Sequence, residues 1–446
     1  MMLILVIAMI MVSHVTMVVV TEKYVIKTRI IGLVDVRQMG IHILFVYNTQ
    51  KKSGYFFRTS LFGLFNQIEK MKKLFILSFL ICFTMCTPKP QTSDAIFVDL
   101  DQPEEASLFN YFRSIELIPL ETSSEVLIKG ITKIIVHQDR YYALDKPLCL
   151  IFVFDKTGKF LFKIGTKGQG AGEYSFIQDF TLNSFSGNLE ILEPYGRIHV
   201  YDLSGKFIET KRIDYPGFKV AHSLAALDST IYVSHSMFEP KKIIYFNLDK
   251  QKLLHEEFEE DMSLGSYSNI PYQYQDNWFF FRPVHPVVYK LGKKRLEVAF
   301  QFNFGKYTNG GRTAVLSKEA ERDFAKNKKE MFDQFSYMIQ SVRHNNKYIF
   351  ASLFWKDQNH RANIIHDKST GKTKYILDFK EKVWFNSYRG EEIIVTDEYA
   401  LMPIQWVDLE KRITKEMLDD KQKEILEKLL QADMEQNPIL IKYWFK

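Results

Sequence analysis

Cysteine is scarce in this sequence. There are 3 cysteines among 446 residues, and two of them, Cys82 and Cys86, fall within one short apolar stretch near the N-terminus. Only Cys149 remains for the rest of the chain, which excludes a disulfide framework or a cysteine-rich metal site there. Its surroundings, PLCLIFVF, predict a small buried hydrophobic side chain.

Familiar catalytic motifs are missing as well. The sequence has no G-x-S-x-G, no H-E-x-x-H and no C-x-x-C pattern. The segment GTKGQGAGEY (165–174) is rich in glycine, but it has neither the G-K-[ST] ending of a phosphate loop nor the G-x-G-x-x-G of a dinucleotide loop. We therefore expect no nucleotide and no other cofactor, and we interpret these glycines as structural.

The chain also lacks an excess of one charge outside its first 85 residues. The net charge of +6 comes from that segment, because residues 86–446 carry 49 basic and 50 acidic side chains. A basic surface is the first requirement for binding nucleic acid, so we predict no nucleic-acid partner.

Two apolar stretches near the N-terminus look like export signals. Residues 1–20 have no basic residue ahead of them, whereas residues 71–86 contain Met71, two lysines, an apolar run and Cys86 in the order of a secretory signal peptide. Two interpretations remain open: residues 1–20 anchor the protein in a membrane, or translation begins at Met71 and residues 1–70 are a mis-assigned upstream segment. We favour the second.

The stretch ending at Cys86 resembles a bacterial lipoprotein signal, in which the cysteine becomes the lipidated first residue. Phe83-Thr84-Met85 departs from the usual small residues before that cysteine, and Cys82 is a weaker alternative. An unmodified Cys86 within a cleaved signal is the other interpretation. Residues 87–107 are expected to form a tether, because they begin with a polar, proline-containing stretch.

An internal repeat organises the remaining sequence. IFVFDKTGKFLFKIG (151–165) and IHVYDLSGKFIETKRI (198–213) both run from an alternating strand into D-x-x-G-K-F. The pairs Asp155/Gly158 and Asp202/Gly205 lie 47 residues apart. Asp before a turn can bond to the following backbone and Gly can adopt positive φ, so each copy predicts a hairpin with a bulged turn.

Weaker copies continue the repeat at similar spacing. They begin at Ile243, Val287 and Ile364, and the last restores Asp367 and Gly371. Each copy follows two further strand-like runs, and a unit of about 45 residues with four strands is typical of a β-propeller blade. The alternative is a β-sandwich with fortuitous spacing. An early strand at 114–122 and a final strand in PILIKYWFK would close the ring, which gives six blades.

Two segments depart from the β pattern. Residues 317–338 place apolar residues on one helical face after a possible N-cap at Ser317, which predicts a helix inserted at the rim. Residues 414–433, with Thr414 as the expected N-cap, predict a C-terminal helix before the closing strand. The fold prediction is thus all-β: a six-bladed β-propeller, residues 108–446, with a rim helix and a C-terminal helix.

The glycine segment is similar to the G-x-x-G-x-G-x-G-E-[FY] segment of NHL-repeat propellers. The residues that match are Gly165, Gly168, Gly170, Gly172, Glu173 and Tyr174. Together with IELIPLET and the terminal NPILIKYWFK, the chain resembles six-bladed propeller lipoproteins of Gram-negative bacteria over about residues 86–446. The resemblance implies an exported periplasmic or outer-membrane lipoprotein, lipidated at Cys86, and it implies no established reaction.

A few residues outside the repeat motif could form a metal site or a ligand-binding surface. His222 and His235 follow two strand-like runs of one blade and could reach the channel to bind a metal, although ordinary strand histidines are the simpler interpretation. HEEFEEDM (255–262) is interpreted as a solvated turn. The aromatic segment PYQYQDNWFFFRP (271–283) is expected to pack between blades, with a sugar-stacking surface as the alternative.

The sequence favours a binding or scaffold module in the cell envelope. We expect its ligand to be a glycan, a peptide or an envelope protein, and its membrane contact to be the lipid anchor. The alternative is a hydrolase, lyase or lactonase centred on the channel, because propellers host both classes.

Overall fold

The computed structural model describes residues 29–36, 41–47, 95–236, 242–257, 271–308, 315, 317–320, 323–357, 360–382, 393–432 and 436–446. The chain divides into two units, Met1–Gln91 and Thr92–Lys446. In the first unit, β1 (Arg29–Val36) and β2 (Ile41–Tyr47) form an antiparallel hairpin. Cys82, Cys86 and the whole predicted signal peptide lie outside the described residues.

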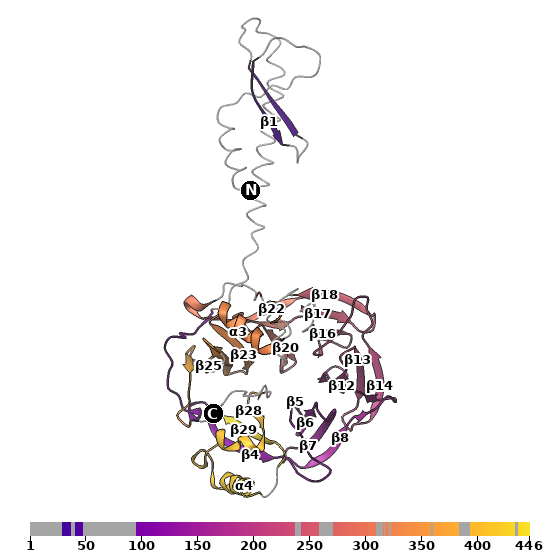
Figure 1. Ribbon diagram of the computed structural model, residues 1–446, viewed down its shortest axis with the longest axis vertical. Coiled ribbons are helices and arrows are strands. Elements are labelled where there is room, and N and C mark those ends of the chain that lie inside the picture. The colour runs from indigo at the N-terminus through magenta and orange to yellow at the C-terminus, as the bar shows by residue number, and fades with distance from the viewer. Residues whose placement is uncertain are drawn as a thin grey trace. The chain divides into compact units, whose positions relative to one another are not determined.

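The second unit is a six-bladed β-propeller, as the repeat predicted, with its sheets arranged in a ring (Figure 1). We number the blades along the chain. Blade 1 contains β5 (Lys133–His137), β6 (Arg140–Asp145), β7 (Leu150–Asp155) and β8 (Phe160–Ile164). Blade 2 contains β11 (Asp179–Asn183), β12 (Asn188–Leu192), β13 (Arg197–Tyr201) and β14 (Phe207–Arg212). Blade 3 contains β15 (Ala225–Ala226), β16 (Ile231–Ser236), β17 (Lys242–Asn247) and β18 (Lys252–Glu257).

The second half of the ring follows the same order, from the innermost strand outward. Blade 4 contains β19 (Tyr272–Tyr274), β20 (Asn277–Phe281), β21 (Val287–Leu291) and β22 (Leu296–Asn303). Blade 5 contains β23 (Tyr337–His344), β24 (Tyr348–Trp355), β25 (Arg361–Asp367) and β26 (Thr373–Ile376). Blade 6 contains β27 (Ile394–Val395), β28 (Tyr399–Ile404), β29 (Ile439–Phe445) and β4 (Phe112–Pro119).

The core lies between the faces of neighbouring blades. One cluster joins Tyr142 and Ile151 of blade 1 to Phe180 and Ile191 of blade 2, all four buried. The central strand β7 reads as a near-continuous apolar run because both of its faces are covered, whereas the outer strand β8 alternates between half-buried and exposed residues. Many of the chain's aromatic side chains lie in this core, because large rings fill the space between twisted sheets.

The ring closes by pairing the two ends of the second unit. The early strand β4 runs antiparallel to the final strand β29, with Ile118 opposite Leu440. Asn437, which is buried, reinforces this closure: its Nδ2 donates to the carbonyls of Glu121 and Val126 at 2.7 Å each, and its Oδ1 accepts from Ile128 N at 2.8 Å. Closure therefore makes β4 the outermost strand of blade 6 and covers the edge of β29.

The structure describes residues 95–107 of the segment predicted as a tether, 87–107. Within it, β3 (Ile96–Phe97) pairs in parallel with β22 and adds a fifth strand to blade 4. Val98, Leu100 and Ala106 are buried. The tether prediction was therefore wrong from Ile96 onward, because the apolar residues of AIFVDL contribute a strand and core contacts.

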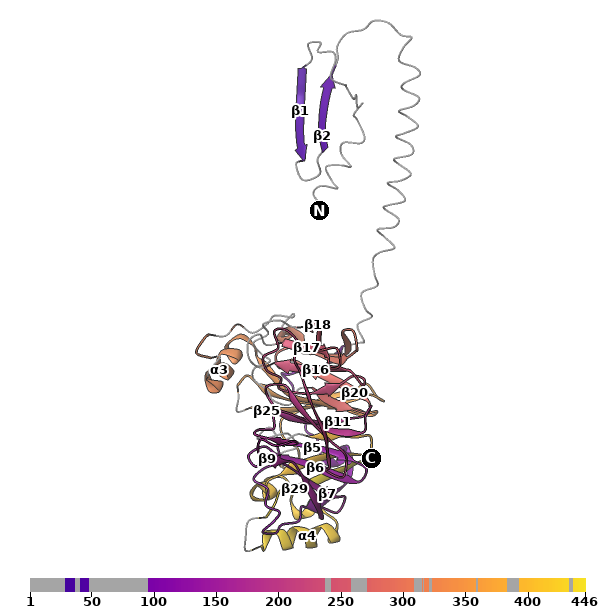
Figure 2. The ribbon, with the colours of Figure 1, turned by 90° about the vertical axis from the view of Figure 1, so that its right-hand side faces the viewer.

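Both helices are shorter than predicted, and Figure 2 shows α3 projecting from the ring and α4 lying at its rim beside blade 6. The rim helix predicted at 317–338 is α3 (Phe324–Gln334), because β23 already begins at Tyr337. Ser317 does not cap it: Ser317 Oγ accepts from Ala320 N at 3.2 Å within a separate turn.

The C-terminal helix predicted at 414–433 is α4 (Asp420–Leu430). Its N-cap is Asp419, whose carboxylate accepts from Gln422 N at 2.9 Å, and not Thr414. Thr414 instead precedes a single 3-10 turn, Lys415–Met417. The other 3-10 turns among the described residues are η1 (Leu108–Asn110), η3 (Gly305–Tyr307) and η4 (Trp406–Lys411). Within the described residues, no helix is both long and apolar enough to cross a membrane.

Candidate functional site

A cavity of about 540 Å³, which we call the central cavity, is lined by residues from the innermost strands and first turns of four blades. It runs along β5, from Lys133 to His137. Three other blades contribute residues at or just after the end of their innermost strand: Leu182 and Ser184 in blade 2, Tyr274 to Asp276 in blade 4, and Val395 to Asp397 in blade 6. The cavity is therefore built from the innermost strands of four blades and from the turns that follow three of those strands.

Asp397 is the centre of a hydrogen-bond network at this cavity. Its Oδ1 accepts from Tyr274 Oη at 2.7 Å and from Asn346 N at 2.9 Å, while its Oδ2 accepts from Gln275 Nε2 at 3.4 Å. Burial alone would raise the pKa of Asp397, but these hydrogen bonds and nearby Lys368 hold that pKa below its usual value. Blades 4, 5 and 6 thus share one ionised carboxylate.

Tyr274 and His137 are the other titratable groups of interest on the cavity wall. Burial and the hydrogen bond to Asp397 raise the pKa of Tyr274, so its phenol stays protonated and acts as a donor. Burial lowers the pKa of His137, which favours the neutral imidazole. The wall therefore offers both donors and acceptors, and Gln273 and Asp276 are exposed beside them.

The aromatic segment 271–283 mostly packs between blades. Tyr272, Trp278 and Phe279 are all at least 93% buried, and Tyr272 Oη bonds His344 Nδ1 at 2.9 Å. Only Tyr274 remains half-buried at the cavity. The structure thus gives this segment a packing function, and one of its rings can still meet a ligand.

His222 and His235 lie together, with ring centroids 5.9 Å apart. Among the described residues, no group of three or more His, Cys, Asp or Glu side chains is placed to hold a metal ion. In the acidic segment 255–262, His255 stacks on Tyr245 with a centroid distance of 4.0 Å. The rest of that segment, from position 258, lies outside the described residues.

The glycine segment lies between the outer strand of blade 1 and the inner strand of blade 2. Thr166–Lys167 (β9) and Glu173–Tyr174 (β10) pair in parallel and close it into a loop. Gly165 has φ +100°, and a Cβ there would overlap the Tyr174 hydroxyl. The Tyr174 ring is fully buried and packs against His199 of blade 2 with a centroid distance of 5.6 Å.

The other glycines of this segment are constrained for different reasons. Glu173 Oε2 accepts from Gly170 N at 2.8 Å, and this carboxylate occupies the space where Gly168 or Gly170 would carry a Cβ. Gly172 has φ +75° and lies against Phe207. Its carbonyl accepts from the Tyr201 hydroxyl. The segment contacts its own side chains and blade 2, and none of its residues lines the central cavity.

The three Asp–Gly turns lie at the outer hairpins of blades 1, 2 and 5. Asp155 accepts from Thr157 N at 2.8 Å, Asp202 from Ser204 N at 2.9 Å and Asp367 from Ser369 N at 2.8 Å. Gly158, Gly205 and Gly371 all have positive φ. Each of these turns joins the third strand of a blade to its outermost strand, whereas the central cavity is lined mainly by innermost strands. None of the three turns lines the central cavity.

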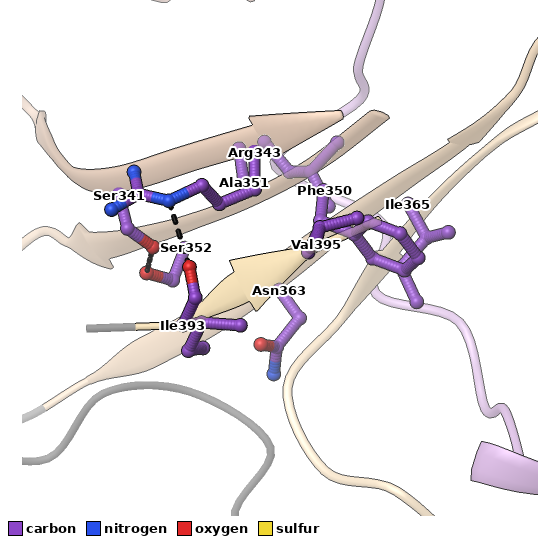
Figure 3. Close-up of a pocket in the computed structure, with 10 residues that line it drawn as sticks. Ser341, Arg343, Phe350, Ala351, Ser352, Asn363, Ile365, Ile393 and Val395 are labelled. Atoms are coloured by element: carbon purple, nitrogen blue, oxygen red, sulfur yellow. Dashed lines mark hydrogen bonds between the residues drawn. The ribbon is translucent and has the colours of Figure 1, made fainter. Parts of the chain in front are cut away.

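A second, much smaller cavity lies between blades 5 and 6 (Figure 3). Its volume is about 20 Å³, enough for roughly one water molecule. Arg343 Nε donates to the Ile393 carbonyl at 2.8 Å, and the Ser341 and Ser352 hydroxyls lie 2.7 Å apart. We interpret it as a packing void.

Sequence reasoning missed the residues that matter most at the central cavity. Asp397, Asn346 and Gln275 each lie in or next to a first turn of a blade, and no motif marks them. The repeat itself could have indicated them. The first turns of several blades meet at one end of the propeller channel, so an alignment of the repeats would have placed positions 137, 275 and 397 at equivalent sites.

The comparison with curated proteins gave no match. Among solved structures, the chain is similar to a Bacteroides fragilis NCTC 9343 protein described as a presumed exported protein. The identity is 18%, the match covers 79% of this chain and 99% of that chain, and the TM-score is 0.61. It is also similar to a member of the DUF4221 family from Bacteroides vulgatus ATCC 8482, at 11% identity, 75% and 97% coverage and a TM-score of 0.48.

The first of these likenesses supports the propeller fold and nothing finer, because 18% identity does not carry function. A family profile matches residues 94–443, which is most of the chain and nearly all of the propeller. The chain belongs to the family described as Domain of unknown function (DUF4934).

Proposed function

We propose that the protein is an exported, lipid-anchored propeller that binds an extracytoplasmic ligand in the central cavity. The observation that carries this proposal is the cavity itself. Four blades supply its wall, its volume is about 540 Å³, and polar side chains converge on it around a half-buried tyrosine. Binding sites in proteins of this kind are concave and combine apolar surface with a few placed polar groups.

The chemistry of the wall favours a glycan or a peptide as the ligand. Tyr274 contributes a half-buried aromatic ring, and Gln273, Asp276 and Asp397 add amide and carboxylate groups. Planar polar groups beside an aromatic ring suit the hydroxyls and apolar faces of sugars, and they also suit peptide amides. An envelope protein that inserts a loop would use the same groups.

The proposed address rests on the sequence. Residues 71–86 have the order of a signal peptide, and Cys86 stands where a lipoprotein signal would end. The resemblance to NHL-repeat lipoproteins supports the same assignment. One acyl chain alone binds membranes weakly, so a stable anchor would need the several chains of a lipoprotein N-terminus.

A ligand screen on the purified protein tests the binding proposal. Thermal shift against glycan and peptide panels should yield a ligand that raises the melting temperature, and isothermal titration should then give a saturable heat. The variant Gln273→Ala/Asp276→Ala should weaken that binding about 10-fold or more, because two exposed polar contacts are lost. Tyr195→Ala is the matched control, since Tyr195 is 74% exposed and outside the cavity lining.

The same screen separates the binding module from the enzyme alternative. Each stabilising compound is incubated with the protein, with and without a chelator, and the mixture is analysed by mass spectrometry for product. Unchanged compound supports the binding module. Conversion that the chelator abolishes would favour the hydrolase, lyase or lactonase. A ligand that binds the cavity double variant as well as the native protein would contradict the proposed site.

The anchor is tested separately in cells. Cys86→Ser should abolish incorporation of a labelled fatty acid and release the protein from the membrane fraction, whereas Cys82→Ser should change neither. Intact mass of the native protein should match residues 86–446 plus the lipid attached to Cys86. A peptide from residues 21–70 in the native protein would contradict initiation at Met71.

A further inference from the structure

A second polar cluster lies where blades 1, 2 and 3 meet, at the start of β5 and so at the opposite end of that strand from His137. We call it the cationic cluster. Lys133 and Asp179 begin the inner strands of blades 1 and 2. Its other members are Lys146, His222, Ser223 and His235.

The single carboxylate of the cluster is fully engaged. Asp179 Oδ1 accepts from Lys133 Nζ at 2.8 Å, and its Oδ2 accepts from Leu224 N at 2.9 Å. Lys146 has no bonded acceptor among the residues that the structure describes, although it lies near enough to feel the Asp179 charge. One positive charge in this partly buried site is therefore left without a direct counter-ion.

His235 adds an unused hydrogen-bond donor. Its side chain is fully buried. Ser223 Oγ accepts from His235 N at 3.1 Å and lies 2.7 Å from His235 Nδ1. Ser223 Oγ has no other acceptor for its own proton among the described residues, so its donation to Nδ1 satisfies both groups and leaves the ring proton on Nε2. Within the described chain Nε2 has no partner.

The charge state of the cluster follows from its surroundings. Burial, reinforced by His222 and the two lysines, lowers the pKa of His235 to about 3, so the ring is neutral at pH 7. Burial, together with Lys146, likewise lowers the pKa of His222 to about 4. The net charge of the cluster is therefore +1. Two ammonium groups beside the histidines disfavour a metal cation and favour an anion.

We propose that the cationic cluster binds a carboxylate group of the ligand, with Lys146 supplying the charge and His235 Nε2 a hydrogen bond. This inference rests on the proposed function, because Lys133 of the cluster also lines the central cavity. A net charge of +1 matches a carboxylate better than a phosphate dianion. A buried donor that lacks a partner is destabilising, so an anion that accepts from it is stabilised.

The two sources of such a carboxylate are an acidic sugar and the C-terminus of a peptide. Both present the same two oxygens, so the cluster recognises the shared group. The half-buried Tyr274 and the polar wall of the central cavity would contact the rest of the ligand. Testing glucuronate beside a short peptide with a free C-terminus distinguishes them.

The experiment is a titration of the purified protein with sodium acetate against sodium chloride at constant ionic strength. The readout is the ¹⁵N chemical shift of the His235 ring, followed with the melting temperature. Acetate should shift Nε2 saturably. Lys146→Met should weaken acetate at least about 10-fold, and Lys146→Arg should retain most of the affinity. Lys250→Met is the control, because Lys250 is exposed on an outer turn of blade 3.

Three outcomes would overturn the inference: no saturable shift, equal affinity in Lys146→Met and the native protein, or a stronger response to phosphate than to acetate. If a neutral sugar binds the central cavity while acetate leaves His235 unchanged, the proposed function stands and the carboxylate site is wrong. If acetate binds as expected but no larger ligand responds to the cavity double variant, the carboxylate site stands and the proposed function is wrong.

Discussion

The first two hairpins of the propeller are near copies in sequence, yet they have different neighbours in the structure. Both contain D-x-x-G-K-F, and both glycines have nearly the same backbone, with φ +89° at Gly158 and +88° at Gly205. Gly158 lies against the Pro119 carbonyl of the closing strand β4. Gly205 lies against the side chains of Phe162 and Ile164 in blade 1.

This difference shows that equivalent residues of a repeat can have different neighbours once the repeats close into a ring. At Gly205, blade 2 meets the side chains of Phe162 and Ile164 in blade 1, and these can adjust. Blade 1 meets blade 6 through backbone: Glu121 N donates to the Gly158 carbonyl at 2.9 Å, immediately after β4 ends. The same turn therefore tolerates different changes in the two blades, because backbone atoms cannot move aside as side chains can.

Gly158→Ala should be the most damaging change to either hairpin. The new Cβ would overlap the Pro119 carbonyl, and the positive φ adds strain of about 1–2 kcal/mol. With the cost of overpacking, we expect a loss of about 3–5 kcal/mol in the free energy of unfolding. Urea denaturation followed by tryptophan fluorescence measures it. A loss under about 1 kcal/mol would mean that β4 moves freely against blade 1.

Gly205→Ala should be milder. The positive φ costs the same, but the nearest atoms to the new Cβ are side-chain carbons at 3.3 Å, which can shift slightly. We expect a loss of about 1–2 kcal/mol, measured by the same denaturation. Equal losses for the two glycine variants would show that ring closure adds no constraint and would remove the contrast between the two hairpins.

The sequence was sufficient for the repeat and the closure, because both depend on local patterns. Alternation and D-x-x-G marked the hairpins, and the apolar strands at both ends of the propeller marked the closing pair. It was insufficient where a contact joins distant segments. Nothing at Gly158 reveals that Pro119 will lie against it, and the two glycines look equivalent until the ring is closed.

The candidate site was less predictable for the same reason. His222 and His235 were recognised as possible channel residues, but their meaning depends on Lys146, which stands 76 residues or more away in sequence. Asp397 and Tyr274 are 123 residues apart and share a hydrogen bond. The limits of α3 and of the tether were also predicted wrongly. Residues that looked helical belong to β23, and residues that looked unstructured belong to β3, because both segments pair with neighbouring strands.

Glu121→Ala probes the closure with a smaller change. Glu121 Oε2 accepts from Phe160 N at 3.0 Å and so ties the chain after β4 to the blade 1 hairpin. This bond is exposed to water, so we expect a loss of about 0.5–1 kcal/mol in the free energy of unfolding. Glu209→Ala, on the exposed outer strand of blade 2, is the matched control and should change it by less. A larger effect at Glu209 would contradict the importance of the closing contact.

Acid should affect the two hairpins equally, in contrast to the glycine substitutions. The Thr157 hydroxyl and backbone lower the pKa of Asp155, and the Ser204 hydroxyl and the backbone of Lys206 and Ser204 lower that of Asp202. A carboxyl whose pKa is lower in the folded state stabilises the fold above its unfolded pKa of about 3.9, and this contribution is lost as the pH falls through the folded pKa. Asp155→Asn and Asp202→Asn should therefore each flatten the fall of melting temperature below about pH 4, and by similar amounts. If Asp155→Asn alone changed the acid profile, the closing strand would be acting on the aspartate as well as on the glycine. We expect equality, because all hydrogen bonds to either carboxylate come from within its own turn.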